Sequence, residues 1–458
     1  MIAKRLDQRP IRMFRSKKLF IFLTVLLIVC SASAIDKAHY IELFKKVTVL
    51  AKQKDWQGAR DVLTEIGREL PAPTPRYLLV VASIEARMGH KAEAQKWVQK
   101  YVATGLSYNF MKDGDLKEIL SDEAGQQLLA QMKQKNQPIE KTEFVCSLPQ
   151  ADTMPEDIAY IKGVGAKSEG EFIVSSIQHH TLYRVSLPKA GSKECTMQEL
   201  PLPYEAKRWP TLAVSADPKR KVLWMTANAM PGFSGFPKED EGKAVLFEVD
   251  ASSGKVLHRY TPETSGPAVL GDMQITNHGT VYVTDSMGGG VYRLRGNPDT
   301  AKLEKIADGL FSPQTPALSR DGKRLFVADY SMGIAVIDLT AAPDAKVNYL
   351  PHPENVAVVA LDGLYLSGDS LIGIQNGTEP VRILRLNLNH AQTEITGAEV
   401  IEQNTERMGD PTHAVPVDGW FYVSANVGWS KVDDDTGKLR DGEKFTPPVL
   451  LRFPMPKE

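Results

Sequence analysis

The sequence contains few cysteines and few of the short motifs that identify common enzyme classes. Three of its 458 residues are cysteine, and none forms a Cys-x-x-Cys pair, which argues against a zinc site and against thioredoxin-like redox chemistry. The stretch GVGAKSEG (163–170) lacks the Gly-Lys-Ser order of a phosphate-binding loop. GFSGF (232–236) lacks the spacing of a serine nucleophile elbow. Because no dinucleotide-binding fingerprint is present either, these motifs leave the function open.

An excess of basic charge is also absent. The formal net charge is −1, although residues 1–34 carry seven Lys and Arg against one acid. Without that segment, whose net charge is +6, the chain carries a net charge of −7. A mildly acidic chain without a basic stripe argues against nucleic acid as the main partner.

The one long apolar run lies at the N-terminus. Basic MFRSKK (13–18) precedes apolar LFIFLTVLLIV (19–29), and the small residues Ser33 and Ala34 follow. The apolar run has about half of the ~20 residues that a membrane span needs. The pattern therefore predicts a signal peptide over residues 1–34 that is cleaved after Ala34. We expect an exported protein, periplasmic or secreted, with no stable membrane span after cleavage.

Cleavage of the signal peptide leaves two cysteines, Cys146 and Cys195. An exported chain permits a disulfide bond. Isolated cysteines in apolar, strand-like contexts are, however, more often buried and unpaired. The sequence favours the unpaired interpretation and leaves the pairing open.

Residues 36–134 have helical periodicity. Apolar residues recur at intervals of three and four, which places Trp56, Ala59 and Leu63 on one helix face. A second helix pair carries small residues where its helices cross: Ala82, Gly89, Ala92 and Ala94. This segment resembles tetratricopeptide repeats. That resemblance implies a groove for a protein partner, and the alternative is a packing collar on the main domain. The polar residues 135–141 are predicted as a linker.

From residue 142 to residue 458 the apolar period changes to two, and one pattern is repeated six times. Each copy has a short entry, an apolar strand, a tight turn and a second apolar strand, usually followed by further strands. The six entries are MPEDIAY (154–160), WPTLAV (209–214), LGDMQI (270–275), SPQTPAL (312–318), PENVAV (353–358) and DPTHAV (410–415). Their spacing is typical of propeller blades. We predict a mainly β fold, a six-bladed β-propeller with an N-terminal α-helical domain. TEFVCSLP (142–149) is expected to close the ring as the outer strand of the last blade.

Propeller geometry places the entries and the ends of the second strands on one face, around the mouth of the central channel. Several oxygen ligands at a channel suit a hard divalent cation such as Ca²⁺. The predicted metal ligands are Glu156, Asp272, Glu354 and Asn355. A structural ion and a catalytic ion are both consistent with this pattern. The second strands end in Ser176, Asn228, Asp285, Asp329, Asn376 and Asn426, a set that turn formation explains in part.

Three residues are candidates for proton transfer at this mouth. His413 occupies the sixth entry, Asp157 the first entry, and His179 the loop after the second strand of the first blade. Histidine titrates near neutrality and serves as a general acid or base. The alternative is that a loop histidine such as His179 is only solvated.

The predicted propeller, residues 142–458, resembles the senescence-marker-protein/gluconolactonase group and its strictosidine-synthase-like and NHL-like relatives. The resemblance rests on PEDIAY, PENVAV and RDGKRLFVADYSMGIAVIDL (320–339), and it covers about two thirds of the chain. It implies one divalent cation in the channel, held by a first-blade Glu and by Asn or Asp of later entries. Glu156 matches the first of these ligands, and Glu354-Asn355 falls on a later entry. The Asp-Gly entry of the family, which carries the metal-binding base, is missing from the predicted entries.

Two functions follow from these expectations. The first is an exported, metal-dependent hydrolase of lactones or related esters, in which the cation polarises the carbonyl group. The second is a non-catalytic propeller that binds a small molecule, or a protein partner through the helical repeats. The acidic and histidine residues favour the first function, and the helical segment favours the second.

Overall fold

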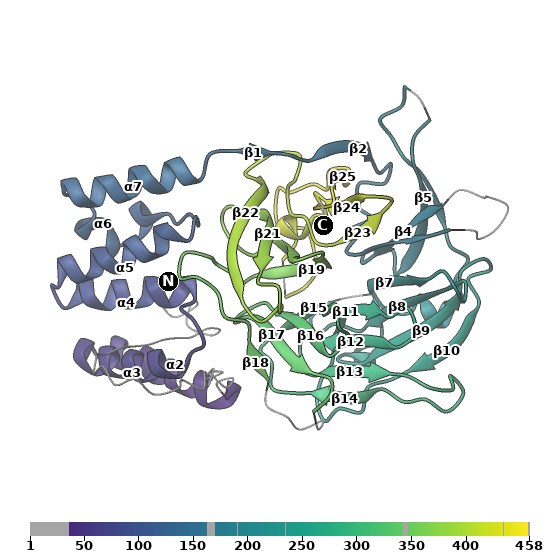
Figure 1. Ribbon diagram of the computed structural model, residues 1–458, viewed down its shortest axis with the longest axis horizontal. Helices are drawn as coiled ribbons and strands as arrows, with labels where there is room; N and C mark the ends of the chain where they lie inside the picture. The colour runs from purple at the N-terminus through teal and green to yellow at the C-terminus, as the bar shows by residue number, and fades with distance from the viewer. Residues whose placement is uncertain are drawn as a thin grey trace.

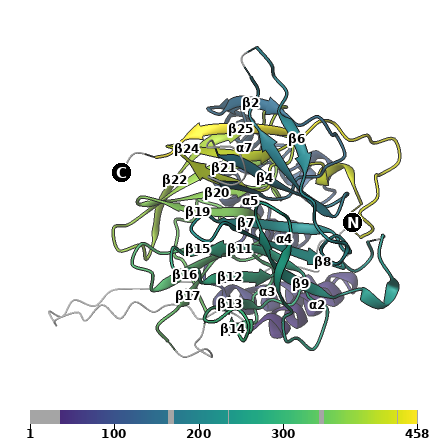
Figure 2. The same ribbon diagram turned by 90° about the vertical axis from the view of Figure 1, so that its right-hand side faces the viewer.

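The protein consists of a block of helices and a ring of six β-sheets, as Figures 1 and 2 show. The computed structural model describes residues 36–162, 170–189, 191–233, 235–341, 347–433 and 435–456. The predicted signal peptide, most of GVGAKSEG and one residue of GFSGF lie outside these residues. Within the described part of the chain, no helix combines the length and the apolar composition needed to cross a bilayer.

Six helices form the N-terminal part of the described chain. They are α2 (Lys37–Lys52), α3 (Trp56–Glu69), α4 (Pro75–Arg87), α5 (Lys91–Ala103), α6 (Leu116–Ile119) and α7 (Glu123–Lys135). Four of them begin at a side chain that caps a backbone N–H three residues later: Asp36, Asp55, Thr74 and Asp122. α2 packs against α3 and α4 packs against α5, so the two predicted helix pairs are present.

The strands of the described chain form six antiparallel sheets, which are arranged in a ring (Figure 2). In chain order, blade 1 consists of β3 (Ile158–Ile161), β4 (Glu171–Ser176), β5 (Thr181–Ser186) and β6 (Thr196–Glu199), and blade 2 consists of β7 (Thr211–Asp217), β8 (Val222–Asn228), β9 (Ala244–Asp250) and β10 (Val256–Tyr260). Blade 3 consists of β11 (Leu270–Ile275), β12 (Val281–Asp285), β13 (Val291–Leu294) and β14 (Glu304–Ala307), and blade 4 consists of β15 (Pro313–Leu318), β16 (Arg324–Asp329), β17 (Gly333–Asp338) and β18 (Asn348–Tyr349). Blade 5 consists of β19 (Leu361–Ser367), β20 (Ser370–Gln375), β21 (Arg382–Leu388) and β22 (Ile395–Gln403), and blade 6 consists of β23 (Ala414–Val417), β24 (Trp420–Ala425) and β25 (Val449–Pro454). The predicted fold class, a six-bladed β-propeller preceded by helices, is confirmed.

The ring closes through the strand that precedes blade 1 in the sequence. β2 (Glu143–Ser147) pairs with β25 and supplies the outer strand of blade 6, which confirms the closure expected for TEFVCSLP. The segment 135–141, predicted as a linker, also contains β1 (Ile139–Glu140), which pairs with β22 as a fifth strand of blade 5. Both strands cover sheet edges that would otherwise be open.

A disulfide bond reinforces this closure. Cys146 of β2 is bonded to Cys195, which directly precedes β6 of blade 1. Both cysteines are almost completely buried. The sequence left the pairing of these cysteines open, and the structure shows it, because ring closure brings the first strand of the propeller beside the outer strand of blade 1.

The innermost strand of blade 5 differs from the prediction. PENVAV (353–358) is irregular, and β19 has the sequence LDGLYLS instead. Residues 356–360 are buried between blades 4 and 5, which explains their apolar sequence without strand pairing. Ala360 has φ 56°, a left-handed conformation that turns the chain into β19. An Asp-Gly pair, Asp362 and Gly363, therefore lies in the innermost strand of blade 5.

The helices lie on the propeller face formed by the entries, over blades 4 and 5 (Figure 1). The ammonium group of Lys37 donates to the carbonyl oxygens of Leu310 and Phe311, 3.0 Å away in each case, just before β15. The ring of Tyr40 lies 5.1 Å from that of Phe311. Buried Arg382, at the start of β21, donates to the carbonyl oxygen of Thr104 over 3.2 Å. The helical part thus packs as a collar on one face, and the opposite face is the one toward the viewer in Figure 2.

Candidate functional site

Four ionisable side chains meet where the innermost strands converge on the channel axis. They are Glu156, Asp272, Asp362 and His413, hereafter the channel cluster, and they come from blades 1, 3, 5 and 6. One ligand atom each from Glu156, Asp362 and His413 lies within 4.8 Å of the others. Nε2 of His413 lies 2.7 Å from Oδ1 of Asp272. The exposed fractions of these four residues range only from 2% to 9%.

The imidazole of His413 is held with Nε2 toward the other members. Its Nδ1 lies 2.9 Å from the carbonyl oxygen of Glu156. Since that oxygen only accepts hydrogen bonds, Nδ1 carries a proton, and Nε2 is the nitrogen available to a ligand. Nε2 of His413 is paired with Oδ1 of Asp272, whereas the other carboxylate oxygen of Asp272, Oδ2, is buried and has no hydrogen-bond partner in the described part of the chain. Unsatisfied buried polar atoms are rare in folded proteins.

The buried charges perturb one another. Burial, together with the carboxyl group of Asp362, raises the pKa of Glu156 well above its ordinary value. Burial also raises the pKa of Asp362, to about 7, and neighbouring Asp272 adds to this effect. Burial alone would lower the pKa of His413, but the charge of Asp272 outweighs it, and the pKa of His413 is raised. Without a bound cation, the channel cluster therefore holds protons near neutral pH.

The entry side of the channel cluster is covered by protein. The indole N–H of Trp429 donates to Oε2 of Glu156. Trp429 belongs to the segment between β24 and β25, where Val427 and Val432 pack with Met154 and apolar residues of the neighbouring blades. The sequence predicted an open mouth on this face. The structure differs, because the long segment of blade 6 and the helices both pack over the entries.

The main cavity of the channel lies on the other side of the cluster. It has a volume of about 660 Å³ and is lined by the innermost strands of all six blades. His413 and Asp272 lie at its inner end, and the turns 276–278 and 319–322 form its outer rim. The walls between combine polar and apolar surface, with the phenol of Tyr365 near His413. This cavity has the size of a small-molecule site.

Two of the predicted proton-transfer residues have other roles in the structure. Both carboxylate oxygens of Asp157 accept backbone N–H groups, of Ile158 over 2.7 Å and of Val214 over 2.8 Å. Burial raises the pKa of Asp157 to about 6. Asp157 lines the cavity but ties blade 1 to blade 2. His179 contacts Asp152 and Tyr183 instead of the channel cluster.

Two of the predicted metal ligands lie at the surface. The side chain of Glu354 is 61% exposed, and its carboxylate lies 3.2 Å from Nζ of Lys100 on α5. Asn355 is exposed as well. The prediction placed them in the channel because PENVAV was aligned with the other entries. In the structure, that position of blade 5 belongs to Asp362, which the sequence analysis missed. The Asp-Gly pair before an alternating apolar stretch was the signal that identifies it.

The polar ring at the ends of the second strands is mainly structural. Asp285 accepts from the backbone N–H of Val269 over 2.9 Å, and Asn228 exchanges hydrogen bonds with the backbone of Leu270. These contacts connect second strands to entries, as capping side chains do. Asn376 is different, because its amide donates to Oδ2 of Asp362 over 2.6 Å.

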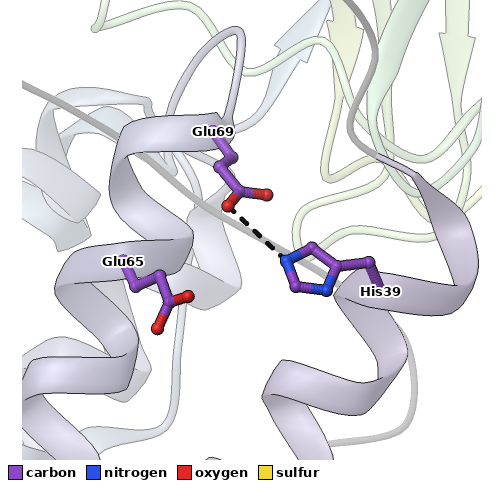
Figure 3. A group of neighbouring side chains, drawn as sticks. All are labelled: His39, Glu65 and Glu69. Carbon is purple, nitrogen blue, oxygen red and sulfur yellow. Dashed lines mark ion pairs between the residues drawn. The ribbon is translucent and has the colours of Figure 1, made fainter.

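A second group of potential cation ligands lies on the helices (Figure 3). Nε2 of His39, on α2, lies 3.6 Å from Oε1 of Glu69, on α3, and Glu65 lies one turn earlier on the same helix. All three side chains are exposed. Water solvates such charges well without an ion, so this group is a surface ion pair with a neighbouring carboxylate.

Comparisons with known proteins find only distantly similar structures. No family model and no curated protein matches the sequence. Solved structures similar to the chain include the PQQ-bound aldose sugar dehydrogenase of Streptomyces coelicolor, with 13% identity and a TM-score of 0.42 over 68% of this chain and 96% of that one. Virginiamycin B lyase of Staphylococcus aureus has 14% identity and a TM-score of 0.40, and the match covers 63% of this chain and 83% of the lyase. A luciferin-regenerating enzyme has 11% identity and a TM-score of 0.40, and the match covers 69% of this chain and 92% of that enzyme. No activity is assigned from similarity at this level.

Proposed function

We propose that the propeller binds a divalent cation at Glu156, Asp362 and His413 and hydrolyses a small lactone or ester in the channel cavity. The observation that carries the proposal is the convergence of one ligand atom each from Glu156, Asp362 and His413 within 4.8 Å of one another, at the inner end of a cavity of about 660 Å³. The neighbouring Oδ2 of Asp272 is buried without a hydrogen-bond partner in the described part of the chain. A cation would compensate the charges of these buried carboxylates.

The ligand chemistry fits a divalent cation. Carboxylate oxygens suit Ca²⁺, Mg²⁺ and Mn²⁺, and an imidazole nitrogen shifts the preference toward transition metals. The sequence predicted Ca²⁺, and the nitrogen of His413 makes Mn²⁺ an equal candidate. Glu156 is oriented by Trp429, Asp362 by Asn376, and His413 by the carbonyl oxygen of Glu156. Each ligand thus has a supporting hydrogen bond.

Hydrolysis needs a base for the attacking water, and Asp272 is placed to serve. A bound cation supplies polarisation of the substrate carbonyl. Oδ2 of Asp272 accepts the proton of a water molecule whose oxygen attacks the carbonyl carbon. The proton then passes to the oxygen that is released when the ring C–O bond breaks, so one lactone and one water give one hydroxy acid. Tyr365, whose oxygen accepts from the N–H of Ala414 over 2.8 Å, keeps its own proton to orient the substrate.

Replacement of the proposed base tests this reaction. Asp272→Asn is expected to lower kcat for lactone hydrolysis at least 100-fold, the usual lower bound for loss of a general base. The assay measures proton release from γ-butyrolactone and glucono-δ-lactone with Ca²⁺ or Mn²⁺ at neutral pH. Asp321→Asn, at the rim of the same cavity, is the matched control and should keep full activity. Full activity in Asp272→Asn would reject the role of this base.

Trp429 is expected to tune the affinity for the cation. Trp429→Phe removes the N–H that stabilises the ionised form of Glu156 and keeps an aromatic ring in place. A hydrogen bond to a charged group contributes about 1.5–3 kcal/mol, so the cation Kd should rise at least tenfold. Isothermal titration of the cation measures this change. Phe445→Leu, in the same apolar group, is the control; an equal loss there would mean that packing, and not the hydrogen bond, sets the affinity.

The second candidate function is a non-catalytic binding protein. A second cavity of about 250 Å³ between the helices and the propeller favours it. In this function a small molecule is the ligand, and the helices serve as a collar. A protein partner for the helices stays a prediction. Wild-type protein that binds the cation yet hydrolyses neither lactones nor aryl esters would favour this second function.

We also propose that the protein is exported. The signal-peptide pattern of residues 1–34 and the disulfide between Cys146 and Cys195 support this localisation, since disulfide bonds persist in oxidising compartments. Cell fractionation combined with thiol labelling under denaturing conditions tests it. A cytoplasmic protein with free thiols would contradict it.

A further inference from the structure

The cavity between the helices and the propeller lies on the opposite side of the channel cluster from the main cavity. It has a volume of about 250 Å³. On the helix side it is lined by residues of α4, α5 and the segment after α5, and on the propeller side by loops of blades 4 and 5. Domain interfaces are common places for small-molecule sites, and the volume suits a small metabolite rather than a peptide.

The lining of this cavity combines a buried arginine with aromatic and aliphatic side chains, and the exposed residue Glu379 lies on its propeller side. Arg76 of α4 is only 8% exposed and belongs to the lining. Tyr101 and Tyr108 form one wall; their hydroxyl groups donate to Ser107 and Asp113, which holds the rings in place. The planar, charged guanidinium group of an arginine matches the geometry of a carboxylate. This chemistry is complementary to a small carboxylate with an apolar or aromatic body.

The propeller wall of the same cavity is connected to the channel cluster. Tyr330, which lines the cavity, donates from its hydroxyl to Oδ1 of Asn376 over 2.8 Å. Asn376 in turn donates to Oδ2 of Asp362 over 2.6 Å. Gly377 permits this approach, because a Cβ there would lie 2.0 Å from the hydroxyl oxygen of Tyr330. Two hydrogen bonds therefore join the cavity wall to a proposed ligand of the cation.

We propose that this interdomain cavity is a second ligand site, which binds small carboxylates through Arg76, and that its occupancy changes the cation affinity through Tyr330 and Asn376. The binding step is independent of the proposed cation-dependent hydrolysis and specifies the ligand class of the second candidate function. The coupling rests on the proposed function, since it requires a cation at Asp362. Coupling is reciprocal, so the cation must change the affinity for the carboxylate by the same factor.

The binding step is tested with benzoate as the probe and the neutral, isosteric benzamide as its comparison, both in the presence of a chelator. We expect benzoate to bind the wild-type protein at least ten times more tightly than benzamide, because only benzoate forms charge-assisted hydrogen bonds with Arg76. Arg76→Gln should remove this preference. Arg68→Gln, at an exposed arginine of α3, is the matched control and should keep it. Equal binding of the two probes by the wild-type protein overturns the site, even if Arg76→Gln fails to fold.

The coupling step is tested by titrating Ca²⁺ or Mn²⁺ with and without saturating benzoate. We expect the cation Kd to change at least threefold in the wild-type protein and to stay unchanged by benzoate in Tyr330→Phe, which lacks the hydroxyl donor but keeps the ring. Benzoate binding without any effect on the cation Kd would overturn the coupling. Cation binding without benzoate binding would overturn the second site and leave the proposed function intact. Benzoate binding without cation binding would reject the proposed function and the coupling but retain the site.

Discussion

Ca²⁺ or Mn²⁺ at one hundred times its dissociation constant is expected to raise the free energy of unfolding of the wild-type protein by about 2.7 kcal/mol, and Asp362→Asn is expected to lose this gain. The substitution removes the charge that the cation needs. It preserves the side-chain oxygen that accepts from Asn376. Thermal and urea unfolding with added cation or excess chelator measure the effect.

Two further variants make this experiment specific. Glu156→Gln should also lose the cation-dependent gain, since Glu156 supplies another proposed ligand. Glu354→Gln should keep the whole gain, because Glu354 is exposed and paired with Lys100 outside the channel. In chelator, Asp362→Asn should be no less stable than the wild type, since a buried carboxyl group with a raised pKa is replaced by a neutral amide. A cation-dependent gain that persists in Asp362→Asn would place the cation elsewhere.

Loss of the disulfide bond is expected to have the largest effect on stability. The bond between Cys146 and Cys195 spans a sequence separation of 49 residues. Loop-closure entropy for a loop of that length corresponds to about 4 kcal/mol of stability. Replacement of both cysteines by alanine should therefore lower the free energy of unfolding by about 2–4 kcal/mol, measured by urea unfolding. The bond joins the closure strand β2 to blade 1, so the ring itself should open more readily.

Reduction provides an independent control for this prediction. Wild-type protein unfolded in the presence of a phosphine reductant should show the stability of the double variant. The reductant should leave the double variant unchanged, because Cys146 and Cys195 are the only cysteines after residue 34. A loss below about 1 kcal/mol in the double variant would mean that strand pairing of β2 with β25 closes the ring without help from the disulfide.

The period-two pattern predicted the propeller because each blade needs two apolar faces to pack between its neighbours. The same reasoning predicted the closure strand, since a ring of sheets leaves an unpaired edge unless a strand from the other end of the chain covers it. It also identified Glu156, Asp272 and His413, which the structure brings together. The repeated pattern places these residues at equivalent positions of successive blades, which is why pattern and spacing revealed them.

Asp362 shows where the pattern failed. The buried segment 356–360 has the apolar composition of an innermost strand but packs without strand pairing, so the entry of blade 5 was assigned too early in the sequence. Asp362 lies 13 residues before Gln375, the last residue of β20, just as Asp272 lies 13 residues before Asp285, the last residue of β12. The number of residues before the end of the second strand therefore locates the channel residue of blade 5 better than the pattern of PENVAV, in which a proline and an acidic residue precede apolar residues.

The sequence by itself determined the ring of six blades, its closure and the helical segment, because alternating and helical periodicities follow from burying one face of each element. Only the tertiary structure decided which polar residues meet. It placed Asp362 in the channel and Glu354 at the surface, paired the two cysteines, and covered the predicted mouth with helices and with the segment around Trp429. These outcomes depend on how distant segments pack against each other, and the period of a single strand carries no information about such contacts.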